Sequence, residues 1–584
     1  MTNFDVSKIP FSMAGSYMAV SDLPENYRWQ ENPKGLYLRT VRSEACVGPT
    51  KSTIIGRLVP TYAGEEIDYT YRATPDELVM ETGKGNIRLC FADPGTILAK
   101  GEKSGLGLRV DFIPAAPFFT YLYEVPCEDY LRYTAVCFGQ NIQYLLGAQE
   151  GISSMAQVWN GCTADGCQLH FQGENQGFLA VIRELAAGWD GVRRVYDYEA
   201  CREETRKKFN DFCNIIHQVP KRYEETALLA AYVDWSCIVA KSGFLGRPAM
   251  YMSKNWMCSL WSWDHCFNAV ALAHENPEAA WDQWILPFDH QDSTGLIPDN
   301  VCNSKVDWNY CKPPVQGWAL SRMMRVMKLS EAQLAEAYDK LEKWTDWWLN
   351  YRDTDGDGVC EYNHGYDSGW DNATAFAEMP PVASPDLQAY LILQTDALVE
   401  LAEKLGRKDQ ASRWKRRGEA LLDAMVRWCF ENGRPRVFHR GSHETVPTRS
   451  LLPYVAVLVG DRLPKELVEN MVEVLKGPEF LTDYGFATES PASQLYDSDG
   501  YWRGPIWAPS TLLILDGLMK CGEEAFAREV AERFCRMVKD NGFAENFDAL
   551  TGAGRRDLAY TWTPSVFLIF ANEYLKEESE AGSR

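Results

Sequence analysis

The chain has 584 residues, of which 46% are hydrophobic and 24% charged, a balance typical of a globular protein long enough for more than one domain. Its 59 Lys and Arg residues against 81 Asp and Glu residues give a net charge of −22. Such a charge repels nucleic acids and anionic membranes, so we exclude both as expected partners.

The 17 cysteines are scattered through apolar stretches and form no CxxC pair. Free, buried cysteines are typical of a reducing compartment. The first residues, MTNFDVSKIPFSMAGS, lack the basic and apolar regions of a signal peptide, and no uncharged stretch reaches the length of a transmembrane helix. We therefore expect a cytoplasmic protein with no membrane partner.

Residues 1–195 follow a pattern of period two. Ile87, Leu89 and Phe91 alternate with polar residues, and further runs behave in the same way. Turn-forming stretches such as Asp93-Pro94-Gly95 separate the runs at short intervals. This pattern predicts an antiparallel β-sandwich or barrel at the start of the chain.

The stretch 196–220 is rich in Arg, Lys and Glu, and we predict a linker helix there, over Tyr198 to Phe212. From residue 221 the apolar period changes to 3.6, which predicts helices. Ser330-Glu331-Ala332-Gln333 forms a capping box that opens one of them, and Ser384-Pro385-Asp386 is predicted to cap another. The helices come in pairs with long loops between alternate members, which suggests an α/α toroid over 221–584.

The unusual residues gather in five non-periodic segments: WMCSLWSWDHCF (256–267), KPPVQGW (312–318), YRDTDGDGVCEYNHGYDSGWDNATAF (351–376), YWRGPIW (501–507) and NGFAENFDALTGAG (541–554). Glycoside cleavage needs two carboxyl groups on opposite sides of the scissile bond. Asp371 and Glu545 are the best pair, because each lies in a glycine-bearing loop flanked by aromatic residues. The alternative readings are a helix N-cap for Asp371 and a solvated carboxylate for Glu545.

The segments WSWD, KPPVQGWA, DxDGDGVxEY, DSGWDN, YWRGPIW and ENFDALTG follow one another in the order seen in glycoside hydrolase family 63. The chain resembles a bacterial member of that family over residues 250–570. The resemblance implies a β-rich domain followed by an (α/α)6 barrel, and inversion at an α-linked residue, usually glucose. It implies that Asp371 is the general acid and Glu545 the general base. For inversion, the two carboxyl groups should lie ~6.5–9.5 Å apart, with a water beside the base.

The WxWD motif of the family implies that Trp261, Trp263 and Asp264 surround the nonreducing sugar, with Asp264 accepting hydrogen bonds from its hydroxyl groups. Further candidates for the pocket wall are Gln316, Gly317, Trp370, Tyr501, Trp502 and Arg503. Arg503 can equally be structural, orienting a carboxylate through a bidentate pair. The chain departs from the family pattern at four positions, none of which removes a catalytic carboxylate: Asp367, Ala373, Phe547 and Ala549.

Asp353, Asp355, Asp357 and Glu361 form the pattern DxDxDGxxE, whose alternating oxygen ligands suit Ca²⁺. An EF-hand would place a bidentate glutamate at the twelfth position, where this chain has His364. The alternative is an Asp–Gly turn that ends a helix. A bound calcium would support the loop rather than take part in the reaction, which requires no cofactor.

We therefore expect an exo-acting, inverting hydrolase of α-glucosidic bonds in a small oligosaccharide or glucosyl conjugate, with a small-molecule carbohydrate as its partner. The alternatives are a trehalase, a glucosylglycerate or mannosylglycerate hydrolase, an inverting disaccharide phosphorylase, and a noncatalytic sugar-binding protein. In a phosphorylase the ENFDALTG loop has no role, because phosphate replaces the base. The leaving group, the linkage, the choice between glucose and mannose, and the oligomeric state stay open at this point.

Overall fold

The computed structural model describes residues 2–27, 32–42, 53–113, 120–125, 130–189, 191–192 and 194–576. The chain divides into two compact units. The first contains Met1–Asn214, Ala231–Ser259 and Cys302–Lys305, and the second contains Ile215–Ala230, Leu260–Val301 and Val306–Arg584. The domain boundaries predicted at residues 195 and 220 lie on either side of the division between Asn214 and Ile215.

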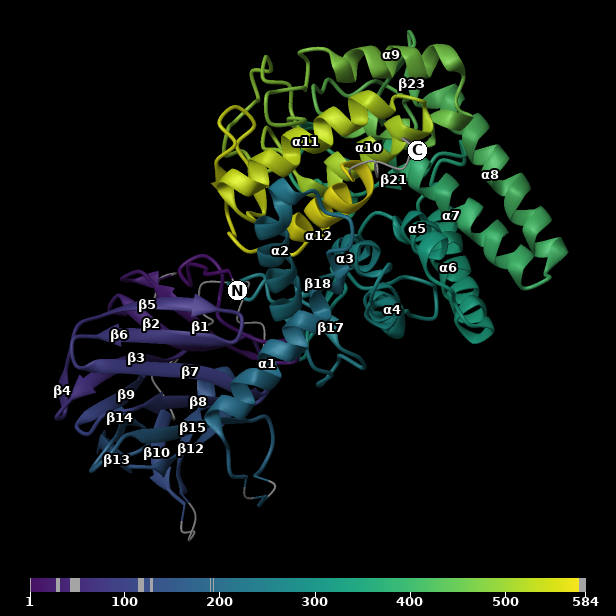
Figure 1. Cartoon of the computed structure of the whole chain (residues 1–584). Helices are drawn as coiled ribbons and strands as arrows, with labels where there is room; N and C mark the ends of the chain where they lie inside the picture. The colour runs from purple at the N-terminus through teal and green to yellow at the C-terminus, as the bar shows by residue number, and fades with distance from the viewer. Residues whose placement is uncertain are drawn as a thin grey trace, which may run out of the picture. The chain divides into compact units, whose positions relative to one another are not determined.

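Two antiparallel sheets make up most of the first unit (Figure 1). Among the described residues, one sheet has the order β1 (Met18–Leu23), β2 (Gly35–Thr40), β3 (Ile54–Tyr62), β9 (Leu106–Phe112), β14 (Ala164–Gln172) and β13 (Ile152–Trp159), with β4 (Glu65–Glu66) paired to β3. The other has the order β10 (Thr120–Glu124), β11 (Leu131–Cys137), β12 (Ile142–Glu150), β15 (Phe178–Leu185), β8 (Thr96–Gly101), β7 (Gly85–Asp93), β6 (Glu77–Thr82) and β5 (Tyr69–Thr74).

The alternating pattern of the sequence corresponds to these strands. Ile87, Leu89 and Phe91 in β7 are buried, and the turn Asp93-Pro94-Gly95 leads into β8. Successive side chains of a strand point to opposite faces, so an apolar residue at every second position buries one face of the sheet. The predicted antiparallel strands in this part of the chain are confirmed.

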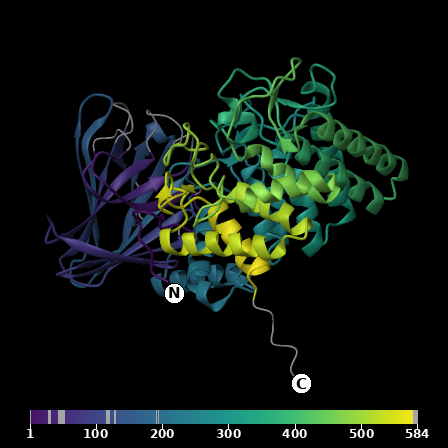
Figure 2. The same ribbon diagram turned by 90° about the horizontal axis from the view of Figure 1, so that it is seen from above.

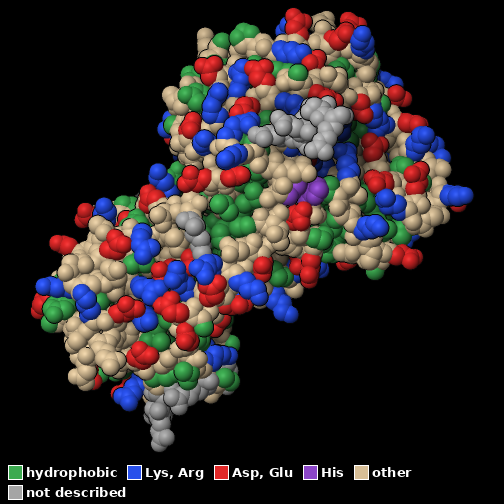
Figure 3. All heavy atoms as spheres, in the orientation of Figure 1, with side chains coloured by type: hydrophobic (Ala, Val, Ile, Leu, Met, Phe, Trp, Pro, Cys, Tyr) green, Lys and Arg blue, Asp and Glu red, His purple; other side chains and the backbone are tan. Residues whose placement is uncertain are grey.

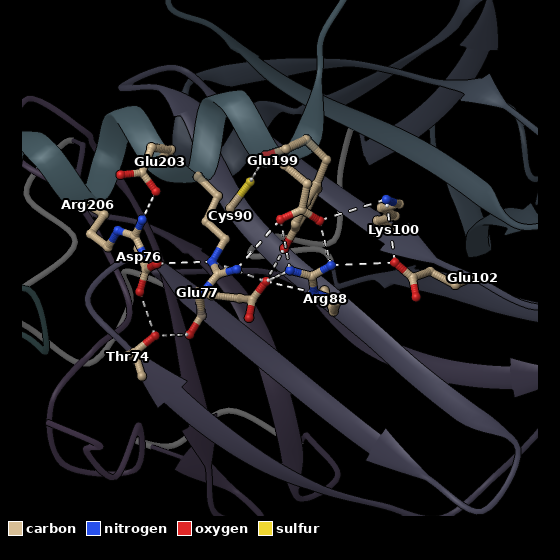
Figure 4. A network of polar contacts seen from close by, with 12 residues as sticks. Thr74, Asp76, Glu77, Arg88, Cys90, Lys100, Glu102, Glu199, Glu203 and Arg206 are labelled. Carbon is tan, nitrogen blue, oxygen red and sulfur yellow. Dashed lines mark hydrogen bonds and ion pairs between the residues drawn. The ribbon is translucent and has the colours of Figure 1, made fainter. Parts of the chain in front are cut away.

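α1 (Tyr198–Phe212) packs on β7 through a network of charged and polar side chains (Figure 4). Arg88 of β7 donates hydrogen bonds to Glu77 at 2.8 Å and to Glu199 of α1 at 2.6 Å. The Tyr198 hydroxyl donates to Glu77 at 3.1 Å. The predicted helix over these residues is confirmed, and partly buried ion pairs fix it to the sheet.

Helices follow from α2 (Glu224–Cys237) onwards, and Figure 2 shows them from above. The longer helices that lie wholly in the second unit include α3 (Asp264–Leu272), α4 (Pro277–Ile285), α5 (Gln316–Val326), α6 (Glu331–Tyr351), α7 (Pro385–Lys404), α8 (Lys408–Trp428), η8 (Leu452–Arg462), α9 (Lys465–Lys476), α10 (Ala508–Lys520), α11 (Glu524–Asn541), α12 (Trp562–Ile569) and η9 (Phe570–Tyr574). Short strands in the loops include β18 (Leu260–Trp261), β19 (Asn300–Val301), β20 (Val306–Asp307), β21 (Glu361–Tyr362), β22 (Val382–Ala383), β25 (Phe438–His439), β26 (Asn546–Phe547) and β27 (Gly554–Arg555).

The helices of the second unit contact one another in a recurring order. α3 contacts α5, α5 contacts α7, α7 contacts η8, η8 contacts α10, α10 contacts α12, and α12 contacts α3. A second set packs beside these helices: α4 on α3, α6 and α8 on α7, α9 on η8, and α11 on α10. The connections that lead into α3, α5, α7, α10 and α12 carry the five segments in which the sequence concentrates its unusual residues.

Helix boundaries show where local patterns succeed and fail. The capping box at Ser330 and Gln333 is present, which confirms that prediction. Ser384 occupies the N-cap position of α7, as predicted, but its hydroxyl donates to the Asp386 side chain and forms no capping hydrogen bond to a backbone amide. α3 begins at Asp264 and α5 at Gln316, inside segments expected to be non-periodic. A helix buried on nearly every side has no polar stripe, so its sequence shows no 3.6-residue period.

No helix among the residues that the structure describes is both long enough and apolar enough to cross a membrane.

Candidate active site

The connections that precede the contacting helices bring several charged side chains into electrostatic range of one another. The charge of Asp371, which precedes α7, acts on Asp264 at the start of α3 and on Lys312 before α5. It also acts on Glu545, which lies between α11 and α12. The two carboxyl groups paired from the sequence therefore share one site, although they are far apart along the chain.

Glu545 lies next to β26, and only 1% of its surface is exposed. Burial, together with the like charge of Asp557, raises its pKa from 4.5 to about 8. The Tyr501 hydroxyl donates a hydrogen bond to Oε1 at 2.9 Å, whereas Oε2 is buried and has no hydrogen-bond partner among the described residues. That second oxygen can accept a hydrogen bond from a water molecule or a substrate hydroxyl.

Asp371 follows a tight turn that requires glycine. Gly369 has a φ of +74°, and a Cβ at this position would lie 2.6 Å from the ring of Trp263. Burial raises the pKa of Asp371 from 3.8 to about 6, although the positive charge of Lys312 opposes the rise. The negative charge of Asp299 adds to it.

Asn372 joins the loop of the candidate acid to the loop before α10. Its Nδ2 donates to the Gly500 carbonyl at 3.0 Å, and its Oδ1 accepts from the Trp502 amide at 2.9 Å. Tyr501 lies between these two anchors with a φ of +64°, which is costly for a bulky residue unless its surroundings hold it. The side chain next to Asp371 therefore positions the tyrosine that binds Glu545.

Lys312 and Asp299 form a buried ion pair that sequence reasoning missed. The Lys312 Nζ lies 3.2 Å from Asp299 Oδ1 and donates to the Tyr366 carbonyl at 2.9 Å. Burial lowers the pKa of Lys312, but the negative charges of Asp299, Asp371 and Asp264 outweigh burial and raise it. A lysine beside the two prolines of KPPVQGW was the available signal for a charged group in the site.

Asp264 is the first residue of α3 and is 3% exposed. The Tyr560 hydroxyl donates to its Oδ1 at 3.1 Å. Burial raises the pKa of Asp264 to about 7, against the effect of the Lys312 charge. Near neutral pH this carboxyl group therefore exists in both forms and can accept or donate a hydrogen bond to a sugar hydroxyl.

The tryptophans predicted to line the pocket fall into two groups. Trp263, Trp370 and Trp502 are at most 2% exposed and pack on one another. Trp502 also stacks on Trp507, with ring centroids 3.9 Å apart and an interplanar angle of 6°. Trp261, in β18, keeps partial exposure. Trp261 therefore retains surface that a sugar ring can contact.

Gln316 and Gly317 are buried at the start of α5. The Gln316 amide donates to the Ser262 carbonyl and accepts from the Trp344 indole at 2.9 Å, which uses both ends of the amide. A Cβ at Gly317 would lie 2.6 Å from Cα of Gln394, so this glycine permits the close approach of α5 and α7. Both residues therefore stabilise the segments that they contact.

Arg503 and Asp367 have different environments. Arg503 forms no ion pair with any residue that the structure describes, and its Nε is buried without a hydrogen-bond partner. Asp367, one of the departures from the family pattern, pairs with Arg352 at 2.9 Å and accepts from the Cys311 amide at 3.2 Å. Its carboxylate therefore anchors the turn before Asp371. The other departures, Ala373, Phe547 and Ala549, are buried apolar side chains.

Asp353 and Glu361, the first and last members of the predicted calcium set, accept hydrogen bonds from within the loop. Asp353 accepts hydrogen bonds from the amides of Gly356 and Gly358 at 3.0 and 3.2 Å. Both carboxylate oxygens of Glu361 accept hydrogen bonds from Thr354, and burial raises the pKa of Glu361 to about 7. This pattern is that of an Asp–Gly turn closed by its own side chains.

Asp355 and Asp357, the middle members of the set, lie close to His443. Ligand atoms of Asp355, Asp357 and His443 lie within 4.8 Å of one another, and His443 Nε2 is 2.8 Å from Asp357 Oδ2. Calcium prefers oxygen ligands, so a set that includes an imidazole fits it poorly. Calcium binding in this loop stays a prediction.

Replacing Glu545 with glutamine should raise the melting temperature at pH 9 and leave it almost unchanged at pH 4. The folded-state pKa of Glu545 is raised, so its contribution to stability is complete below pH 4.5 and is lost as the pH rises through about 8. Between pH 4.5 and about pH 8, the free energy of unfolding of the variant relative to that of the wild type should grow by ~1.4 kcal/mol per pH unit. Thermal melts at both pH values measure it, with Glu466→Gln on the exposed face of α9 as the control. Equal melting temperatures for wild type and Glu545→Gln at pH 9 would contradict the raised pKa.

Comparisons with known proteins relate this chain to glycoside hydrolases. The family model of the mannosylglycerate hydrolase MGH1-like glycoside hydrolase domain matches residues 257–563. The mannosylglycerate hydrolase of Rubrobacter radiotolerans is 25% identical over 403 residues, which cover 53% of this chain and 89% of that protein. The glucosylglycerate hydrolase of Mycolicibacterium hassiacum is 22% identical over 406 residues, which cover 53% of this chain and 91% of that protein.

A solved structure resembles both parts of the chain. A bacterial glucoamylase in complex with acarbose covers 98% of this chain and 95% of its own, with a TM-score of 0.62 and 10% identity. This likeness confirms the order of an antiparallel β-sheet region followed by a helical region. Because the family model matches more than half of the sequence, the chain belongs to the MGH1-like glycoside hydrolases of glycoside hydrolase family 63.

Proposed function

We propose that this glycoside hydrolase is an exo-acting, inverting enzyme that cleaves α-glucosidic bonds in small oligosaccharides or glucosyl conjugates. The observation that carries the proposal is the carboxyl pair of Asp371 and Glu545. They come from separate loops, the charge of Asp371 acts on Glu545, and their pKa values are raised to about 6 and about 8. Hydrolysis with inversion needs one carboxyl group to protonate the leaving oxygen and another to activate water.

In the proposed reaction, Asp371 gives its proton to the glycosidic oxygen as the bond from that oxygen to the anomeric carbon breaks. Glu545 takes a proton from a water molecule whose oxygen attacks the anomeric carbon from the opposite face. The products are the leaving alcohol and a sugar of inverted configuration. The unpartnered Oε2 of Glu545 suits the water, and the Tyr501 hydroxyl on Oε1 keeps the carboxylate oriented. Each proton transfer would contribute ~10²–10⁴-fold.

The raised pKa values imply that the pair holds one proton near neutral pH. Below pH 6 both carboxyl groups are protonated and no base remains, whereas above pH 8 both are ionised and no acid remains. Between these limits the higher pKa of Glu545 places the proton on this residue in the free enzyme. A water or sugar hydroxyl that donates to Oε2 stabilises ionised Glu545 and shifts the proton to Asp371 as the substrate binds.

We assign sugar binding to the polar groups beside this pair. Asp264 and Lys312 are charged groups within electrostatic range of Asp371 and can bind hydroxyl groups from two directions. The partly exposed ring of Trp261 offers an apolar surface for the sugar.

We also propose that the helices of the second unit form a closed (α/α)6 toroid. The contacts that run from α3 through α5, α7, η8, α10 and α12 and return to α3 support a closed inner ring. The outer set of helices packs beside members of that ring, as a toroid requires. Such an arrangement would gather the loops that carry Asp371, Tyr501 and Glu545 at one end.

A hydrolase of glucosylglycerate or mannosylglycerate is the second candidate. The names of two relatives, from Mycolicibacterium hassiacum and Rubrobacter radiotolerans, favour it. In both candidates a single sugar leaves a small acceptor, so the same acid and base serve both reactions. A trehalase would use the same pair on a disaccharide.

The first test of the proposal is a panel of α-glucosides and α-mannosides that includes trehalose, glucosylglycerate and mannosylglycerate. We expect proton NMR to record β-glucose as the first anomer released from an α-glucoside, because water attacks from the opposite face. Initial release of α-glucose would overturn inversion. Turnover of mannosylglycerate alone would replace glucose with mannose, and turnover of trehalose alone would identify a trehalase.

Substitutions separate the acid from the base. Asp371→Asn should lower kcat on an ordinary glycoside by at least ~10²-fold and retain most activity on α-glucosyl fluoride, because fluoride leaves without protonation. Glu545→Gln should lose activity on both substrates, since both need an activated water. Initial rates on the two substrates measure this, with Glu466→Gln as the control. A loss on α-glucosyl fluoride for Asp371→Asn that equals its loss on the glycoside would overturn its assignment as the acid.

The pH profile of kcat/KM should be bell-shaped, with activity falling below about pH 6 and above about pH 8. The Tyr501 hydrogen bond lowers the pKa of Glu545, so Tyr501→Phe should move the alkaline limb to higher pH. Rates measured at constant ionic strength from pH 4 to pH 10 check both statements. An identical profile for Tyr501→Phe would show that this hydrogen bond does not control the pair.

A further inference from the structure

We propose that His217, His274 and Glu275 form a binding site for a divalent transition-metal ion such as Zn²⁺. One ligand atom from each of these side chains lies within 4.8 Å of the other two. Two imidazole nitrogens and a carboxylate oxygen are a ligand set that Zn²⁺, Co²⁺ and Ni²⁺ accept, with water at the open position. Two ligands of one Zn²⁺ ion, each at ~2.1 Å, lie at most ~4.2 Å apart, so small rotations of exposed side chains suffice.

The backbone that carries His217 is held in place. The side-chain Oδ1 of Asn572, in η9, accepts hydrogen bonds from the amides of His217 and Gln218 at 3.2 and 3.1 Å. Its Nδ2 donates to the Ile215 carbonyl at 2.9 Å. Asn572 is buried, so this clamp fixes the segment from Ile215 to Gln218 before any ion binds.

The other two ligands lie in the tight turn between α3 and α4. The Asn276 amide donates to the Leu272 carbonyl at 2.8 Å, which closes the end of α3. The Asn276 side chain accepts from the Ala279 amide at 3.3 Å and caps α4. His274 and Glu275 therefore project from a turn that is anchored at both ends, and an ion would join two segments that are already ordered.

The electrostatic surroundings suit a cation. His217 Nδ1 is buried and has no hydrogen-bond partner among the described residues. The ring centroids of His217 and His274 lie 4.4 Å apart. The C-terminal end of α3 carries a partial negative charge that favours a cation nearby.

The site is separate from the proposed chemistry. Asp264 begins α3 and His274 follows its other end, so the length of the helix, ~13 Å, separates them. The ion would fix the first segment of the second unit to the α3–α4 turn and would stabilise the fold without contacting the substrate. His274 and Glu275 are exposed, so ions in solution can reach them. On the face of the molecule drawn in Figure 3, acidic and basic side chains are interspersed over the surface.

The test uses the full-length protein, stripped with a chelator and titrated with ZnCl₂ in competition with a chromophoric chelator. We expect His274→Ala and Glu275→Gln to weaken one equivalent of zinc binding by at least ~10-fold. Both side chains are exposed, so these variants should fold normally. Zinc should also raise the melting temperature of the wild type and not that of His274→Ala.

His443→Ala is the matched control, because it alters the separate group of Asp355, Asp357 and His443. We expect His443→Ala to bind zinc at the proposed site as tightly as the wild type does. Zinc should also raise the melting temperature of this variant. Zinc binding by His274→Ala as tight as that of the wild type would overturn the proposal. Absence of zinc binding by the wild type would also overturn it.

Discussion

The site depends on the burial of several carboxyl groups around the ammonium group of Lys312. A buried charge is costly unless another charge or a proton compensates for it. Lys312 compensates for Asp299 through a direct ion pair and acts on Asp264 and Asp371 over a longer range. The remaining charge is relieved by protonation, which is why Glu545 has a pKa of about 8. In the proposed reaction, the proton that a general acid gives up would thus be a consequence of burial.

The buried tryptophans make this electrostatic arrangement possible. Trp502 stacks on Trp507 and packs on Trp370 with an interplanar angle of 31°. All three rings are buried and exclude water from the loops that carry them. Water exclusion lowers the local dielectric constant, so each charge acts more strongly on its neighbours. Asn372 accepts a hydrogen bond from the Trp502 amide, which holds Trp502 and the loop of Asp371 in their relative positions.

Local patterns in the sequence predicted the elements that have one buried and one exposed face. β7 and α6 are examples, because their apolar residues recur with the period of a strand and of a helix. α3 is buried on nearly all sides and showed no period, so its start at Asp264 was expected to be loop. Motif order pointed to Asp371 and Glu545. The pair of Lys312 and Asp299 was missed, because an ion pair between two loops leaves no local pattern.

The ionisation of Asp264 illustrates which physical effect prevails in the site. As the first residue of α3, its carboxylate is favoured by the helix dipole by up to ~2 kcal/mol. The rise of its pKa from 3.8 to about 7 corresponds to ~4 kcal/mol in the opposite direction. Burial therefore outweighs the helix terminus and Lys312 together. In the proposed complex, a sugar hydroxyl that donates a hydrogen bond to Asp264 would offset part of this cost, because such a bond favours the ionised form of a carboxyl group.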